Sequence, residues 1–238
     1  MKRRPGSDLA AAGDLRRIAA DRCHRHRGLH DECRSVPWMA LPAQTVPIDA
    51  DKALGLAAVL LDGQTERWNH TRAVAFRAHE LAAVVPPDQR ELLVAAAWLH
   101  DIGYADELRR TGFHPLDGAR HLQQNGHDPH LAAMVAHHSG ARFVAAYRGL
   151  GRELAAFDFE ENPLTDALTA ADQTIGPHGR PMNVEDRMAD MLARHGPESP
   201  NAKVDRERAP YLRAAVQRTL QRLRNSPERV ASRVERQH

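Results

Sequence analysis

Seven histidine and aspartate side chains interrupt stretches of this 238-residue chain that otherwise have helical, apolar spacing, and they are the first candidates for chemistry. They are His70, His100, Asp101, His114, His137, His138 and Asp172. Imidazole and carboxylate groups are ligands for Zn, Mn, Fe and Mg. Burying them without partners costs several kcal/mol, so we expect them to be paired or metal-bound. If they converge, they form a two-metal site, with ions about 3.5–4 Å apart, that can clamp a phosphate and generate hydroxide.

The segment that must position His100 and Asp101 is the most apolar in the chain. Residues 92–99 (LLVAAAWL) are apolar on every side, which is typical of a central, buried helix. Asp88, followed by Glu91 three residues later, predicts a capping box at its start. Gly103 is expected to end it, so the His-Asp pair lies at its C-terminal end.

The other candidates lie within or beside further predicted helices. Periodicity and capping residues predict helices at 51–61, 66–85, 115–122, 128–138, 142–148, 163–172, 183–194 and 206–224. His70 lies inside the second of these, and the remaining candidates lie where helices begin or end.

Composition supports an all-α fold. Aromatic residues make up only 5% of the chain, and Ala, Leu and Val, with no convincing strand pattern, favour helices. We expect residues 1–48 to be a basic, disordered or loosely structured extension and residues 49–195 to be the helical domain. Residues 196–238 are expected to comprise a linker (196–201), a charged helix and a tail.

Charge and cysteine content exclude several classes of protein. Lys and Arg (33) nearly balance Asp and Glu (31), which gives no sign of specific nucleic-acid binding. No apolar run of about 18 residues predicts a membrane span, and no apolar segment follows the basic N-terminus to make a signal peptide. Only Cys23 and Cys33 are present, so a cytoplasmic location is expected. With three nearby histidines they have the residue types of a zinc site, but their spacing matches no zinc finger.

The order of the candidates resembles the H…HD…D pattern of the HD superfamily of metal-dependent phosphohydrolases. The resemblance covers about residues 52–195 and rests on residues 69–74 (NHTRAV), 98–104 (WLHDIGY) and 170–172 (AAD). Residues 112–119 (GFHPLDGA) and 137–140 (HHSG) resemble the members with two metals. A Gly-Tyr-Pro motif typical of the cyclic-dinucleotide phosphodiesterases in the superfamily does not follow the paired histidines, so hydrolysis of cyclic di-GMP is not expected.

The resemblance implies an HD-domain helical bundle and a role for each candidate. His70, His100, Asp101 and Asp172 would bind a first divalent ion. Asp101 would bridge to a second ion held also by His114 and His137. The ions would be Fe, Mn or Zn, with Mg as an alternative. A bridging water or hydroxide would attack phosphorus, and Asp101 and His138 are the catalytic candidates; His138 is alternatively a ligand or a supporting group.

A cation for the substrate phosphate is less clearly marked. The Lys often found shortly after the His-Asp pair in the superfamily is absent near Tyr104. Arg142 and Arg180 are the candidates that lie in loops next to the motifs. Glu66, one turn before His70, has the position of an extra ligand, although a solvated carboxylate in a first helical turn is the more common role.

The expected activity is hydrolysis of a phosphoester or phosphoanhydride in a nucleotide or another small phosphorylated metabolite. Two alternatives keep the same fold: a diiron oxygenase with the same ligands, and a non-catalytic module that senses nucleotides. The sequence gives no positive sign of oxygenation, and a sensing module would be expected to have lost a ligand.

Overall fold

The computed structural model describes residues 45, 46 and 48–227, all within a compact unit formed by residues 43–238. The extension expected at residues 1–48 therefore lies almost entirely outside the described residues, as do Cys23, Cys33 and the end of the expected tail. The elements are α2 (Ala50–Leu60), α3 (Thr65–Leu81), η1 (Ala82–Val84), η2 (Pro87–Gln89), α4 (Arg90–Leu99), η3 (Ile102–Tyr104), η4 (Asp106–Leu108), α5 (His114–Gln124), α6 (Pro129–His137), η5 (His138–Gly140), α7 (Ala141–Tyr147), α8 (Gly151–Leu154), α9 (Pro163–Gln173), α10 (Val184–His195), α11 (Pro200–Lys203) and α12 (Asp205–Arg224).

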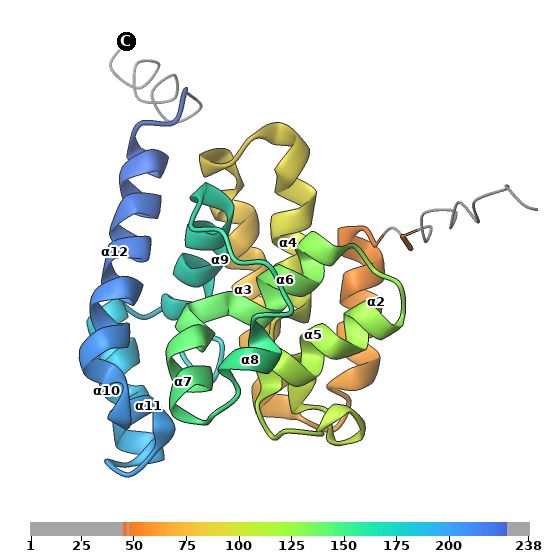
Figure 1. Cartoon of the computed structure of the whole chain (residues 1–238). Helices are drawn as coiled ribbons and strands as arrows, with labels where there is room; N and C mark the ends of the chain where they lie inside the picture. Colours follow the sequence, from red (N-terminus) through yellow and green to blue (C-terminus); the bar gives the residue numbers. More distant parts are fainter. Residues whose placement is uncertain (1–44, 47, 228–238) are drawn as a thin grey trace, which may run out of the picture. The chain divides into compact units, whose positions relative to one another are not determined.

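The fold class is all-α, which confirms the prediction (Figure 1). Within the described ranges the only β pairing consists of two isolated bridges. No helix among these residues is both long and apolar enough to cross a membrane.

Helix α4 is the centre of the core, as its apolar sequence predicts. All five residues from Ala95 to Leu99 are buried, and α4 packs against α2, α3, α6 and α9. These neighbours hold its C-terminal end inside the molecule, so His100 and Asp101 are buried as well.

Helix α12 packs along α9, and Figure 1 shows the two side by side. Its buried residues recur every three or four positions, which gives one apolar face: Ala209, Tyr211, Leu212, Ala215, Val216, Thr219 and Leu223. The charged helix expected after residue 195 therefore contributes to the packing around α9.

Two local expectations are wrong. Asp88 and Glu91 form no capping box, because Pro87 begins a short 3₁₀ helix and α4 starts only at Arg90, with Gln89 as a cap that makes no side-chain hydrogen bond. The linker expected at residues 196–201 contains the start of α11, where the Ser199 side chain accepts a hydrogen bond from the Ala202 N–H and Pro200 occupies the first turn.

Candidate metal centre

Helix ends bring the candidate side chains together. His100 and Asp101 follow α4, His114 opens α5, and His138 follows α6. Asp172 lies in the last turn of α9, and His70 alone comes from the middle of a helix, α3. Helices that converge on one point bring residues distant in the sequence close in space. His70 and Asp172, for example, are in contact although 102 positions separate them.

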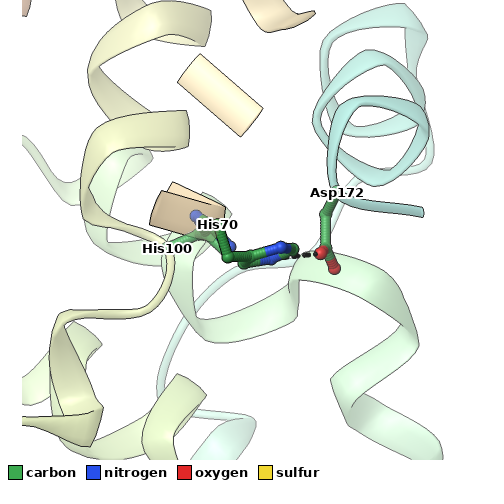
Figure 2. Close-up of side chains that lie close together, drawn as sticks. All are labelled: His70, His100 and Asp172. Carbon is green, nitrogen blue, oxygen red and sulfur yellow. Dashed lines mark hydrogen bonds and ion pairs between the residues drawn. The ribbon is translucent and has the colours of Figure 1, made fainter. Parts of the chain in front are cut away.

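The first group consists of His70, His100 and Asp172, each of which is buried (Figure 2). One ligand atom from each lies within 4.8 Å of the others. His70 Nε2 is 3.0 Å from Asp172 Oδ1, and the two side chains point toward each other in Figure 2.

The second group consists of Asp101, His114 and His138, whose ligand atoms also lie within 4.8 Å of one another. His114 Nε2 is 3.2 Å from both Asp101 Oδ1 and His138 Nε2.

Asp101 stands between the two groups. Its Oδ1 faces His114, as above, and lies 3.9 Å from His138 Nε2. Its Oδ2 lies 3.3 Å from His100 Nε2 and 3.8 Å from His70 Nε2. This is the arrangement that a bridging carboxylate requires.

Backbone hydrogen bonds fix the tautomers of three histidines. Nδ1 of His70, His100 and His138 lies 3.0, 2.7 and 2.7 Å from the carbonyl oxygens of Gly176, Ala97 and Val135, respectively. A carbonyl can only accept, so each Nδ1 donates and a neutral ring keeps its lone pair on Nε2. All three lone pairs therefore belong to the atoms that face the cluster.

These lone pairs face other hydrogen-bond acceptors instead of donors. This arrangement tests whether the residues fit a metal ion, because an ion would occupy the space between the acceptors. His70 Nε2 faces a carboxylate oxygen, and the buried His100 Nε2 has no hydrogen-bond partner among the described residues. Acceptors placed against one another are stable only with a proton or a cation between them. The donor set of four imidazoles and two carboxylates fits divalent ions.

Both carboxylates are held in the ionised form. Burial alone would raise the pKa of Asp101, but the Arg67 guanidinium and His100 hold it well below its usual range. Burial likewise opposes ionisation of Asp172, while the hydrogen bond that His70 donates when a proton rather than a cation lies between the two groups holds its pKa well below its usual range. Ionised carboxylates are the form that binds metal.

The histidines of the second group are held neutral. Burial, and then the repulsion that protonated His100 and His114 would exert, lowers the pKa of His138 to about 3. Burial also lowers the pKa of His114. A neutral imidazole offers the lone pair that a metal needs.

A second layer of hydrogen bonds orients Asp172. Its Oδ2 accepts from the Ser139 hydroxyl and from Gln173 Nε2, the latter at 2.8 Å. Ser139 has a positive φ of 50°, a strained conformation for a residue other than glycine. Arg208 Nε donates to the Ser139 carbonyl oxygen at 2.9 Å, so α12 supports this turn.

His137 does not join the centre, contrary to the ligand set that the resemblance implied. Its Nε2 donates to the Phe157 carbonyl oxygen at 2.8 Å, and its ring packs against Phe159. The chain changes direction here, since α6 ends at His137 and the backbone of His138 is not helical. Consecutive side chains therefore point to different sides, and His138 occupies the position expected for His137.

The two arginines proposed for the substrate also lie elsewhere. The Arg142 guanidinium lies 4.2–4.7 Å from the ring centres of Phe143, Phe159 and Tyr211. Arg180 is exposed in the loop after α9 and does not line the central pocket. Glu66 pairs with His178 at 3.3 Å on the surface and is outside both ligand groups.

Different arginines contact the centre, and the sequence reasoning missed them. Arg67 Nη1 donates to Asp101 Oδ2 at 2.6 Å, and its guanidinium lies over the Tyr104 ring. Arg187, from α10, has Nη2 4.0 Å from Asp172 Oδ1. The position of Arg67, one turn before His70 on the same helical face, was a usable signal; Arg187 had none.

These groups line a pocket of about 250 Å³, in which Arg67, Asp101, His114, His138, Asp172 and Arg187 all have surface. The pocket gives a small molecule access to both ligand groups. Potential metal ligands and flanking cations thus surround a cavity that a small anion can enter.

Comparison with known proteins gives one match. A family model of the HD domain matches residues 67–190, which is more than half of the chain and includes the candidate ligands from His70 to Asp172. No curated protein and no solved structure matches.

Proposed function

Because the chain belongs to the HD domain family, we propose that it is a metal-dependent phosphohydrolase. Its substrate would be the phosphoester or phosphoanhydride of a nucleotide or of another small phosphorylated metabolite. The observation that carries the proposal is the set of histidine lone pairs and ionised carboxylates facing one another beneath an open pocket.

The proposed ligands follow from the two groups. His70, His100 and Asp172 would hold one divalent ion, and His114 and His138 a second, with Asp101 between them. Two such ions supply a hydroxide nucleophile at neutral pH and offset charge on the phosphoryl oxygens. Arg67 can remain on Asp101 Oδ2, since a carboxylate oxygen has two lone pairs.

The protein's own groups would orient and neutralise the substrate. Arg187 has a buried Nε without a hydrogen-bond partner among the described residues, and it lines the pocket beside Asp172. We assign it to a phosphoryl oxygen, because a guanidinium donates to such oxygens in a fixed geometry. His138 is assigned as a ligand rather than as a proton carrier, because its Nδ1–H is bound to the Val135 carbonyl oxygen and its Nε2 belongs to the second ligand group.

The test combines metal analysis with turnover. Protein purified without chelators should contain a divalent metal and release phosphate from members of a panel of nucleotides and phosphoesters. Replacing His100 and Asp101 together by Ala should abolish both properties.

A matched control lies on α3, where His79 is exposed. His79→Ala should keep metal and activity, while His70→Ala should lose both. Unchanged metal content in the His100/Asp101 variant would contradict the site. Tight nucleotide binding without turnover, across several metals, would support the sensing module, and oxygen-dependent turnover of the iron-loaded protein would support the oxygenase.

A further inference from the structure

Positive charge exceeds negative charge around the pocket. Its lining includes Asp101 and Asp172 and five arginines: Arg67, Arg148, Arg187, Arg194 and Arg208. Divalent ions would add to this excess. Charges of one sign that gather in a small pocket favour a ligand with several opposite charges.

Arg187 and Arg194 form a pair that leads away from the ligand groups. Both approach the same oxygen, Asp190 Oδ2, at 3.8 Å for Arg187 Nη1 and 2.9 Å for Arg194 Nε. Arg187 also approaches Asp172 of the first ligand group. Arg194 is linked to that group only through Asp190 and Arg187, so it lies farther from the candidate ligands. Burial, and then the positive charges of Arg194 and Arg187, lower the pKa of His195, which also lines the pocket.

Arg208 adds a charge that is not balanced by a carboxylate. Its Nε donates to the Ser139 carbonyl oxygen, and its Nη1 lies 3.4 Å from Asn201 Oδ1. No carboxylate of the described residues forms an ion pair with it, and burial lowers the pKa of its guanidinium. A partly buried cation with only neutral partners is stabilised by an anionic ligand.

Arg194, Asn201 and Arg208 all lie beyond residue 190, where the family match ends. They belong to α10, α11 and α12, so this part of the pocket lining, called the wall below, is a feature of this chain's C-terminal segment.

We infer that this wall binds a second phosphate directly next to the one that is attacked, so that the substrate is a diphosphate and the bond cleaved is a phosphoanhydride. The inference rests on the proposed phosphohydrolase function. Arg187 would contact the attacked phosphate, and Arg194 with Arg208 the neighbouring one. The oxygen of water bonds to the attacked phosphorus while the bond to the bridging oxygen breaks. The leaving phosphate keeps that electron pair, and water releases a proton.

The spacing favours adjacent phosphates over two distant ones. Arg187 and Arg194 share one carboxylate oxygen, so their guanidinium groups are close neighbours. The pocket volume of about 250 Å³ is also small for a ligand site.

The probes are inorganic phosphate and methylenediphosphonate, a diphosphate analogue that water cannot cleave. Calorimetry on the metal-loaded full chain should show the analogue binding about tenfold tighter or more. Arg194→Gln should remove most of this preference and leave phosphate binding within about twofold, since one charge-assisted contact is lost. Chelation of free metal by the analogue is common to all variants and cancels in the comparison.

Arg206→Gln is the matched control, because Arg206 is exposed on α12 and does not line the pocket. It should keep the wild-type preference. Equal affinity for both probes in the wild type, or equal losses for both in Arg194→Gln, overturns the inference. Turnover of monophosphates alone overturns it too but leaves the proposed function standing. No turnover with a retained preference contradicts the proposed function and the cleavage step, while binding of two adjacent phosphates stands.

Discussion

At the scale of single residues, ring orientation decides which histidines can take part in chemistry. Three rings are held by a hydrogen bond from Nδ1 to a backbone carbonyl, which leaves Nε2 facing the centre. His137 has the opposite arrangement, since its Nε2 is bound to the Phe157 carbonyl oxygen. The identity of a residue as histidine is therefore less informative than the partner of each nitrogen.

This difference predicts opposite outcomes for neighbouring variants. His138→Ala should lower the metal content and reduce turnover strongly, because a proposed ligand is lost. His137→Ala should keep the full metal content and cost about 1 kcal/mol of stability, because it removes one hydrogen bond. Elemental analysis measures the metal content, and chemical denaturation measures the stability. If His137→Ala lost metal while His138→Ala kept it, His137 rather than His138 would be the ligand.

At the scale of elements, close contacts set the positions of the helices that carry the candidate ligands. Gly103 in η3 lies against the start of α5, where a Cβ atom would overlap the His114 carbonyl oxygen and the Gly118 nitrogen. Glycine is therefore required at this position, because the atoms in the way belong to the backbone and cannot rotate aside.

Gly103→Ala should therefore destabilise the protein by about 3 kcal/mol, near the upper end for overpacking, and displace His114. Gly55→Ala is the control, because Gly55 is exposed in α2 and a Cβ there meets nothing within 4 Å. That change should stabilise the helix by about 0.5–1 kcal/mol. Denaturation curves that show equal effects at both sites would contradict the packing argument.

Ion pairs between α9 and α12 fix the helix that bears Asp172. Asp166 is 1% exposed, and its oxygens accept from Arg218 at 2.6 and 2.9 Å and from Arg222 at 2.6 Å. Asp166→Asn should lower the free energy of unfolding by about 2–3 kcal/mol, because a buried acceptor of charged hydrogen bonds is lost. Glu185→Gln is the control. Glu185 of α10 pairs at the surface with Arg213, which like Arg218 belongs to α12, so the loss of this pair should change stability little. Urea denaturation compares the two, and a larger effect at Glu185 would contradict this account.

At the scale of the whole molecule, the helical core and the C-terminal helices depend on each other. The candidate ligands gather around α4, while α12 packs on α9 and supports the Ser139 turn. The domain boundary expected at residue 195 stays a prediction, but the packing of α12 against α9 bears directly on stability.

Removing residues 197–238 should therefore prevent stable folding. The truncation exposes the partners of Tyr211, Leu212, Val216 and Leu223, which are buried against the rest of the unit. At about 1.5–3 kcal/mol for each side chain, the loss is on the order of the total stability of a domain. Circular dichroism during heating measures it; a cooperative transition at the wild-type temperature would show that α12 is dispensable.

The sequence by itself determined the fold class, most of the helices and the order of the metal-binding candidates. Those features are local, because helical periodicity and the WLHDIGY segment can be recognised without knowing what they touch. For the same reason the family could be recognised before the fold was known, and the family match confirms it.

Only the tertiary structure decided which groups surround the centre. His138 replaces His137 because the backbone turns at the end of α6, which spacing does not reveal. Arg187 of α10 and Arg208 of α12 line the pocket, whereas Arg142 and Arg180 do not. Contacts between residues far apart in the chain depend on how helices pack, and no local pattern encodes that packing.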